Sequence, residues 1–352
     1  MQYSDLLLKW YDEVKRDLPW RRTKNPYHIW LSEIMLQQTR VETVKGYYAR
    51  FLEMFPTVAD LASAPQEQVL KAWEGLGYYS RARNLHKAAQ NIVAEHHECF
   101  PESYEAILNL PGIGPYTAGA ISSIALGIPV PAVDGNVYRV ASRFFGIRED
   151  IGTPAVQKKI CHLVQESIPP DRPGDYNQAL MELGATLCSP GTPACDLCPW
   201  SEHCDACREG DSDLLPVHEK KRPAKQVDVA VCLLTWNNRI WVMPRSERML
   251  NGLYVFWLEE AETDPLRLQV LLKENGLESD FVSDLGSAKH VFTHRIWNMK
   301  LYHYELRNMP EEKILNQWNA VMADNEMLSQ LPFPTAVKAA VNEAKTILEK
   351  QS

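Results

Sequence analysis

Five of the eight cysteines crowd into one stretch, CSPGTPACDLCPWSEHCDAC, residues 188–207. In a long chain whose amino terminus does not resemble an export signal, such crowding indicates metal ligation rather than disulfide bonding. Four thiolates can hold either a structural zinc ion or an iron–sulfur cluster. The spacing C-x6-C-x2-C-x5-C begins with a gap unlike the paired C-x2-C of zinc knuckles, so iron–sulfur is favoured. Cys207 is a fifth candidate thiol.

A carboxylate at Asp134, in VPAVDGNVYRVASRFFG, directly precedes a helical pattern. Its side chain can cap that helix, and the helix dipole with its backbone N–H groups should then lower the carboxyl pKa. An ionised carboxylate that faces a sugar can also stabilise an oxocarbenium-like transition state, as in glycoside cleavage. The capping role alone is the structural alternative.

A second carboxylate, Glu33, lies in NPYHIWLSEIMLQQTRV. Asn25 and Pro26 are typical of an N-cap and a first helical residue, so Glu33 is expected on the helix that follows. Its apolar neighbours raise a carboxyl pKa toward the range of a general acid. A partly exposed helix residue without a chemical role is the alternative.

The stretch LPGIGPYTAGAI, residues 110–121, is typical of a tight turn that runs into a helix. Gly112 and Gly114 let the backbone turn and approach another molecule closely, and Pro115 suits the first turn of the next helix. Backbone N–H groups at a helix start bind anions, so the stretch could cradle a phosphate. An ordinary turn between antiparallel helices is the alternative.

The elements that carry these residues change character along the chain. Apolar residues recur at helical spacing up to about residue 207, for example through IWLSEIMLQQTRVETV, and strand patterns are nearly absent there. The polar stretch 208–226 is typical of a linker. Beyond it VDVAVCLLTW and RIWVMPR predict a β-hairpin around Asn237-Asn238. We expect further strand over 290–306 and helices over 264–277 and 334–350.

The composition fits a globular chain of 352 residues in more than one domain. No apolar run approaches the roughly 20 residues of a membrane helix, and we expect a cytoplasmic protein. The net charge of −8 opposes binding to nucleic acid, because phosphate binding usually shows as a basic excess. A groove needs only a local basic face, which LPWRRTK or YYSRARNLHK could supply.

The glycine turn, the segment VPAVDGNVYRV and the cysteine run together resemble the helix-hairpin-helix DNA glycosylases that carry a 4Fe-4S cluster loop. The resemblance implies an all-α glycosylase domain over residues 1–207, with a helical barrel at about 26–135 and a cluster part formed by 1–25 and 136–207. It implies a linker over 208–226 and an α+β Nudix-like domain over 227–352. The implied cluster ligands are Cys188, Cys195, Cys198 and Cys204, with Cys207 a bystander, and the cluster is expected to serve structure and DNA contact.

Two branches of this family differ at the position of Tyr116. The endonuclease III branch has a lysine there, the amine that forms a Schiff base with the sugar. A phenol cannot form an imine, and tyrosine together with VDGNV resembles the MutY-type adenine DNA glycosylases, which remove adenine mispaired with 8-oxoguanine. In that family the matching glutamate, Glu33 here, protonates adenine, Asp134 stabilises the sugar cation, and Tyr116 and Asn136 support the developing charge.

The resemblance also implies residues that handle the DNA. A base must leave the duplex before its glycosidic bond can be cleaved, so a protein side chain must fill the vacated position in the base stack. Gln38 and Tyr78 resemble the wedge residues of the family, and Gln178 resembles the residue that contacts the extruded adenine. A helix-surface amide and a packed aromatic are the alternatives for Gln38 and Tyr78.

The second domain resembles the Nudix-like module that follows the catalytic region in MutY-type enzymes. A working Nudix hydrolase needs clustered glutamates of the form R-E-x-x-E-E, which AETDPLRLQVLLKENGL lacks, so a recognition module is expected. HVFTHRIW resembles the F-S-H element that reads the oxidised base, here Phe292, Thr293 and His294 with threonine for serine. An alternating amphipathic strand is the alternative reading of this segment.

The resemblance therefore implies a monomeric base-excision enzyme, associated with the nucleoid through DNA, whose partner is double-stranded DNA containing adenine opposite 8-oxoguanine. An endonuclease III-like lyase is one alternative, opposed by Tyr116 and by the additional domain. A non-catalytic damage sensor is the other, opposed by the presence of both Glu33 and Asp134.

Overall fold

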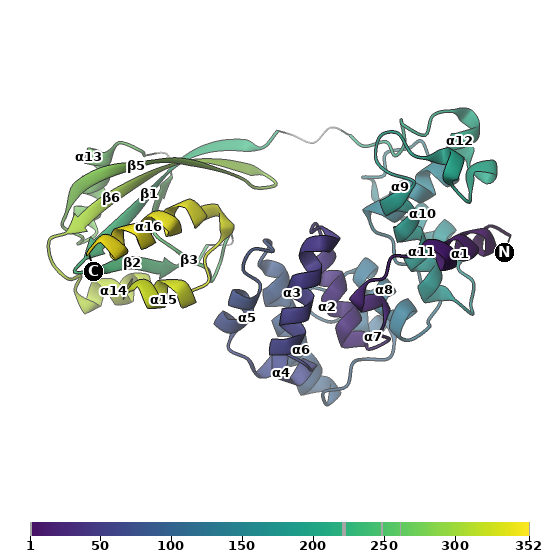
Figure 1. The fold of residues 1–352 in the computed structure, drawn as a ribbon, viewed down its shortest axis with the longest axis horizontal. Coiled ribbons are helices and arrows are strands. Elements are labelled where there is room, and N and C mark those ends of the chain that lie inside the picture. The colour runs from purple at the N-terminus through teal and green to yellow at the C-terminus, as the bar shows by residue number, and fades with distance from the viewer. Residues whose placement is uncertain (1, 220–222, 248, 261, 352) are drawn as a thin grey trace. The chain divides into compact units, whose positions relative to one another are not determined.

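The computed structural model describes residues 2–219, 223–247, 249–260 and 262–351. The chain divides into two compact units, one formed by Met1–Ala64 with Ser80–Lys220 and the other by Pro65–Tyr79 with Lys221–Ser352. Figure 1 shows the helices of the first unit and the sheet of the second. Among the described residues, no helix is both long and apolar enough to span a bilayer.

Short α-helices joined by tight turns build the first unit. Its helices, including three 3-10 turns marked η, are α1 (Gln2–Val14), η1 (Pro19–Arg21), α2 (Pro26–Leu36), α3 (Val41–Met54), α4 (Val58–Ser63), α6 (Ser80–His96), α7 (Tyr104–Leu108), α8 (Pro115–Ala125), α9 (Gly135–Phe144), α10 (Pro154–Ser167), α11 (Pro173–Thr186), η2 (Cys195–Leu197), η3 (Ser201–His203) and α12 (Asp205–Glu209).

The predicted helix starts are confirmed. Asn25 caps α2, since its side chain accepts a hydrogen bond from the Tyr27 backbone N–H at 2.9 Å, and Pro26 opens the helix. Pro115 opens α8 directly after the glycine turn. The capping polar groups and the prolines fix where these helices begin, because each satisfies or removes an orphan N–H.

The apolar run 29–44 does not form one helix. Helix α2 ends at Leu36 and α3 starts at Val41, with a turn between them in which Gln38 has a φ of 59°. Helical spacing on both sides of a short turn is indistinguishable from a continuous helix in the sequence pattern. The turn removes Gln38 from the helix surface on which the pattern would place it.

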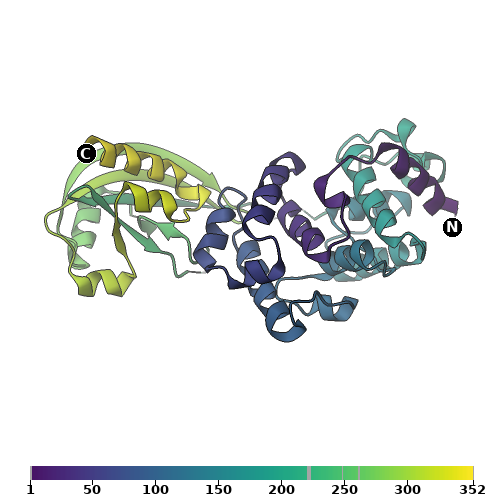
Figure 2. The same ribbon diagram turned by 60° about the horizontal axis from the view of Figure 1, so that its bottom comes forward.

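The N-terminal helix packs against helices that follow more than 100 residues later. Leu7, Leu8 and Tyr11 of α1 share a core with residues of α9, α10 and α11, and with Trp200 in the cysteine loop. Figure 2 shows α1, in purple, beside these teal helices. This core brings the cysteine loop and the Asp134 helix into one packed body.

The predicted linker is shorter than 208–226. Leu215 is 3% exposed, its carbonyl accepts from Arg143 Nε at 3.0 Å, and the Val217 carbonyl accepts from the Ile151 N–H at 3.1 Å. Strand β1 begins at Lys225. Leu215, which lies in a charged stretch, therefore packs as part of the helical unit, and the surrounding polar residues obscure this apolar signal.

A seven-stranded mixed sheet forms the centre of the second unit, in the order β3-β2-β1-β6-β5, with β4 pairing with β1 and β7 with β2. The strands are β1 (Lys225–Trp236), β2 (Arg239–Pro244), β3 (Tyr254–Val255), β4 (Trp257–Glu260), β5 (Ser279–Val291), β6 (Arg295–Leu306) and β7 (Val321–Ala323). The helices of this unit are α5 (Gln66–Ala72), α13 (Pro265–Glu274), α14 (Glu312–Trp318), α15 (Asn325–Gln330), η4 (Thr335–Val337) and α16 (Lys338–Gln351).

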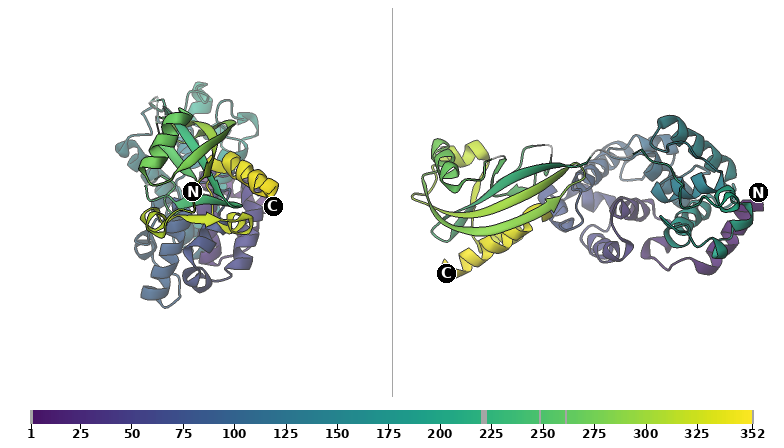
Figure 3. Two further views of the ribbon diagram at one scale, coloured as in Figure 1. Left: turned by 90° about the vertical axis from the view of Figure 1, so that its left-hand side faces the viewer. Right: turned by 90° about the horizontal axis from the view of Figure 1, so that it is seen from above.

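Strand β1 is buried on both faces, which explains its continuous apolar sequence. Val229, Val231 and Leu233 share a core with residues of α15 and α16, whereas the alternate β1 residues share a core with residues of α13. The right-hand view of Figure 3 shows α16, in yellow, along one side of the sheet. The predicted hairpin is confirmed: β1 and β2 pair antiparallel around Asn237 and Asn238, whose φ angles are 43° and 58°.

The expected strand over 290–306 is interrupted. Strands β5 and β6 pair antiparallel, and Phe292, Thr293 and His294 form the turn that joins them, closed by a hydrogen bond from the Phe292 N–H to the Arg295 carbonyl at 2.8 Å. The alternating pattern continues across the turn, so sequence periodicity did not reveal it. These residues therefore lie at a hairpin tip instead of along a strand.

Candidate active site

Glu33 lies on α2 and is only 5% exposed. Burial raises the pKa of its carboxyl to about 7, and the charge of Asp134 also raises this pKa. A hydrogen bond from Tyr116 and the charge of Arg21 oppose the rise. The partly exposed helix residue considered from the sequence is wrong, and a buried carboxyl with a pKa near neutrality can exchange a proton at physiological pH.

Tyr116, the second residue of α8, connects the glycine turn to this carboxyl. Its hydroxyl donates a short hydrogen bond to Glu33 Oε2 and lies 3.8 Å from Met181 Sδ on α11. Burial, with the nearby charges of Glu33 and Asp134, raises the pKa of Tyr116 well above its usual value. The phenol therefore stays protonated and acts as a fixed donor to Glu33.

Asp134 caps α9, as the sequence predicts, by accepting a hydrogen bond from the Val137 N–H at 2.8 Å. The predicted lowering of its pKa is wrong: the pKa is raised, because burial outweighs the backbone N–H groups and the Asn136 amide. Asn136 Nδ2 donates to Asp134 Oδ2 at 2.9 Å. A positive charge next to this carboxyl would favour its ionised form.

Asn136 links Asp134 to the cysteine loop. Its Oδ1 accepts from Arg139 Nη2 at 2.9 Å, and the same nitrogen of Arg139 donates to the Gly184 carbonyl at 2.8 Å. Arg139 Nε donates to the carbonyl of Cys188 at 2.8 Å. A Cβ on Gly184 would lie 2.7 Å from Asn136 Cβ, so glycine permits this close approach of α9 and α11.

An ion-pair cluster that sequence analysis missed borders the same region. Glu182 is buried on α11 and accepts from Arg16 Nε at 2.6 Å and from Arg21 Nη2 at 2.8 Å. Arg21 is the cation that lowers the Glu33 pKa. The charge of Arg21 in LPWRRTK is therefore neutralised inside the fold and does not contribute to a basic surface. The pair was not predicted because Arg21 and Glu182 are 161 residues apart in the sequence.

The glycine turn has two glycines with different structural needs. Gly112 has a φ of 75°, and an added Cβ would lie 2.4 Å from Asn84 Cβ. At Gly114, which caps α8 with a φ of −101°, an added Cβ meets nothing within 4 Å. The fold therefore requires glycine at 112, whereas the bare backbone at 114 faces open space.

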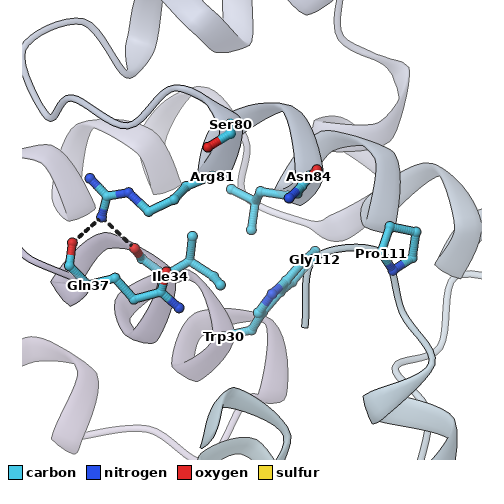
Figure 4. Close-up of a pocket in the computed structure, with 9 residues that line it drawn as sticks. Trp30, Ile34, Gln37, Ser80, Arg81, Asn84, Pro111 and Gly112 are labelled. Atoms are coloured by element: carbon cyan, nitrogen blue, oxygen red, sulfur yellow. Dashed lines mark hydrogen bonds between the residues drawn. The ribbon is translucent and has the colours of Figure 1, made fainter. Parts of the chain in front are cut away.

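Arg81, which is buried on α6, stabilises the turn that contains Gln38. Arg81 Nη1 donates to the carbonyls of Ile34 at 2.7 Å, Met35 at 3.0 Å and Gln37 at 2.7 Å. Figure 4 shows the hydrogen bonds from Arg81 to Ile34 and Gln37 beside a cavity of about 210 Å³, which Asn84 and Gly112 also line. The Arg81 charge thus fixes the end of α2, so YYSRARNLHK supplies less of a basic surface than its sequence suggests.

Gln178 lies half-buried on α11, one turn before Glu182, and its Nε2 donates to the Gly174 carbonyl at 3.3 Å. Tyr78 belongs to the second unit and is 50% exposed, with a φ of 48°. Within that unit its hydroxyl lies 3.4 Å from Thr293 Oγ1. Two residues predicted from separate motifs are therefore neighbours, and the packed-aromatic alternative for Tyr78 is wrong.

Of the three residues at the hairpin tip, Phe292 packs against the core, whereas Thr293 and His294 face solvent. The Phe292 ring packs against Trp297, with ring centroids 5.0 Å apart, and against His290 at 4.6 Å. Thr293 and His294 are exposed. The tip therefore presents one hydroxyl and one imidazole on an anchored turn.

The cysteine loop encloses one cavity, lined by Cys188, Cys195, Cys198, Cys204 and Cys207. Arg143 is 1% exposed beside it and donates from Nη1 to Cys188 Sγ at 3.3 Å. Among the residues that the structure describes, no three or more His, Cys, Asp or Glu side chains converge on a point for a single metal ion. Several thiols on one cavity beside a buried cation form a donor set suited to a thiolate-bound cluster.

This architecture defines a class of DNA repair protein. Residues 31–166 match the model of the HhH-GPD superfamily base excision DNA repair protein, and residues 230–343 match that of the NUDIX domain. The fold of the helical unit is shared with a solved thermostable thymine-DNA glycosylase, at 29% identity and a TM-score of 0.55, over 59% of this chain and 95% of that one.

Comparison with individual proteins of known activity defines the family of this chain more closely. The chain is 35% identical to the adenine DNA glycosylase of Buchnera aphidicola subsp. Schizaphis graminum, over 83% of this chain and 84% of the relative. It is 48% identical to the human adenine DNA glycosylase over 57% of this chain, but that match spans only 38% of the human protein. The chain belongs to the adenine DNA glycosylase family.

Proposed function

We propose that this protein is a base-excision-repair enzyme that binds double-stranded DNA and hydrolyses the N-glycosidic bond of adenine mispaired with 8-oxoguanine or guanine. The observation that carries the proposal is that two carboxyls act on one phenol: Glu33, which is buried, is hydrogen-bonded to Tyr116, and the charges of both Glu33 and Asp134 raise the pKa of Tyr116. The adenine glycosylase relatives support the substrate class.

Glu33 is the general acid in this mechanism. Adenine leaves poorly as an anion, so a ring nitrogen must be protonated as the glycosidic bond breaks. A pKa of about 7 leaves a large share of Glu33 protonated at neutral pH. Tyr116 holds the carboxyl by its hydroxyl and fixes the direction in which the proton is delivered.

Asp134 stabilises the sugar cation that remains. Its carboxylate is anchored by the Val137 N–H and the Asn136 amide, so its position is set before the substrate binds. The positive charge that develops on the sugar favours the ionised form of Asp134, which offsets the effect of burial. Water then completes hydrolysis, and Asn136 keeps Asp134 oriented.

The remaining predicted residues act on the DNA. Gln38 and Tyr78 are exposed residues with positive φ, and we assign them to filling the stack after the base is extruded. Gln178, on α11 near Glu182, contacts the extruded adenine. Gly114 lets the hairpin backbone approach a phosphate, and Gly112 shapes that hairpin.

The cysteine loop holds a 4Fe-4S cluster through Cys188, Cys195, Cys198 and Cys204. A cluster held by these four thiolates would cross-link the loop, and glycosidic cleavage itself needs no electron transfer. The Cys188 carbonyl and Arg139 place this loop in direct hydrogen-bond contact with the residues that orient Asp134.

The second unit is a lesion-reading module. Helix α13 carries only Glu274 as an acidic residue and so lacks the carboxylate cluster of a Nudix hydrolase. Thr293 and His294 are exposed at an anchored hairpin tip, next to Tyr78, and offer a hydroxyl and an imidazole to the oxidised base. An endonuclease III-like lyase is not favoured, because a phenol occupies the position of the amine nucleophile.

The direct test is single-turnover excision from duplexes that carry adenine opposite 8-oxoguanine or opposite guanine. Release of free adenine, without strand cleavage beyond that of alkali-labile sites, is the expected result. Thr293→Val, which removes the hydroxyl at constant size, should reduce the preference for 8-oxoguanine, and Thr293→Ser should retain it. Failure to release adenine from either duplex would reject the function, whereas an unchanged preference in Thr293→Val would reject only the lesion-reading role of this hydroxyl.

A further inference from the structure

The cysteine-loop cavity holds one thiol more than a four-iron cluster requires. Cys207 lines the same cavity as the four proposed ligands. It lies on α12, three residues after Cys204, which is the N-cap of that helix. The cavity therefore contains a spare thiol that is held in place by a helix.

Cys207 contacts two of the proposed ligands. Its thiol is hydrogen-bonded to that of Cys195, and its backbone N–H is hydrogen-bonded to Cys204. Cys195 opens the short turn η2, and its Sγ also lies 3.9 Å from Ser212 Oγ, a further residue lining the cavity. By contrast, Cys188 lies beside Arg143, and Cys204 Sγ contacts the Arg143 carbonyl at 3.4 Å.

The two sides of the cavity also differ in their anchoring. Arg143 is fully enclosed and donates to the carbonyls of Leu215, Ser189 and Gly191, so the side with Cys188 and Cys204 is fixed. Leu197, two residues after Cys195, is 72% exposed, and Asp196 is exposed as well. The Cys195 turn is the side that solvent reaches.

We propose that Cys207 is a reserve ligand, which binds the cluster iron in place of Cys195 when the Cys195 thiolate is absent or damaged. In this replacement one Fe–Sγ bond to Cys207 forms where the bond to Cys195 is missing, and the Cys207 thiol proton passes to solvent. No electron is transferred. The inference rests on the cluster assigned under the proposed function.

The test measures iron and acid-labile sulfide per chain, with the absorbance of the cluster near roughly 400 nm, in the full chain purified anaerobically. The variants are Cys207→Ala, Cys195→Ala, the double variant, and Cys188→Ala as a matched control on the opposite side of the cavity. Alanine is chosen because a serine alkoxide could itself bind iron.

The reserve role predicts four irons in the native chain and in Cys207→Ala, and a comparable content in Cys195→Ala. It predicts a loss of at least half of the iron, or a three-iron cluster seen by electron paramagnetic resonance, in the double variant and in Cys188→Ala. Equal iron loss in Cys195→Ala and the double variant, folded or not, would overturn the proposal. A native chain without iron would instead reject the cluster itself.

Discussion

The Tyr116 hydroxyl donates a hydrogen bond to the Glu33 carboxyl, and so joins the glycine hairpin to the proposed general acid. The two residues are 83 positions apart and belong to α8 and α2. This contact lowers the Glu33 pKa, while burial raises it. The balance leaves the carboxyl at a pKa of about 7, where its protonation can be tuned by a single hydroxyl.

Substitution of either carboxyl should abolish most excision while DNA binding survives. Glu33→Gln keeps the shape but cannot deliver a proton, and general acid catalysis contributes about 10²–10⁴-fold, so we expect single-turnover excision to fall at least roughly 100-fold. Asp134→Asn removes the charge and should cost as much or more. Duplex binding measured by fluorescence anisotropy is the control, and near-native excision in both variants would contradict the mechanism.

The Glu33 carboxyl should make the fold less stable at high pH. A raised carboxyl pKa means that the native state binds the proton more tightly than the unfolded chain does, so its stabilising effect is complete below pH 4.5 and is lost as pH rises through about 7. A shift of this size corresponds to roughly 3 kcal/mol above pH 8. Glu33→Gln should therefore raise the melting temperature more at pH 8.5 than at pH 5; an equal change at both values would contradict the shifted pKa.

Tyr116→Phe tests the hydrogen bond between the two residues. Loss of the hydroxyl removes an interaction that lowers the Glu33 pKa, so the pKa should rise further. The alkaline limb of the single-turnover pH profile, which reports the protonated acid, should then move to higher pH than in the native enzyme. A limb that stays in place or moves to lower pH would show that Tyr116 does not control Glu33.

Tyr116→Lys tests the branch of the family. An amine at this position can form an imine with the sugar, whereas a phenol cannot. Borohydride should trap a covalent complex with DNA for Tyr116→Lys and only a trace for the native chain and for Tyr116→Phe. Strong trapping by the native chain would identify another amine and favour the lyase alternative.

The two glycines of the hairpin form a matched pair. Gly112→Ala places a Cβ against Asn84 at a positive φ and should lower the free energy of unfolding by about 1–3 kcal/mol, measured by urea denaturation. Gly114→Ala meets no neighbour, so stability should stay within about 0.5 kcal/mol of native. If Gly114 lies against DNA, its alanine variant should bind duplex more weakly nonetheless; native affinity there would remove the hairpin from the interface.

The sequence alone determined the features that depend on residues close together in the chain, such as helix starts and tight turns. Asn25, Pro26, Pro115 and Asp134 mark helix starts that the structure confirms, because caps and prolines act within three residues of their own position. The Asn237-Asn238 hairpin is equally local. The family, which the sequence motifs resemble, is confirmed by the relatives, whereas the roles of the two carboxylates and of the cysteine set stay predictions.

Only the tertiary structure revealed the features that depend on burial or on contacts between residues far apart in the sequence. The turns at Gln38 and Thr293 interrupt patterns that continue on both sides, and Arg81 holds the first of them from another helix. The sign of the Asp134 pKa shift reversed because its burial, set by the packing of surrounding helices, outweighs the local cap. The Arg21–Glu182 pair and the contact between Cys195 and Cys207 likewise arise when packing brings separate segments together, which no local pattern records.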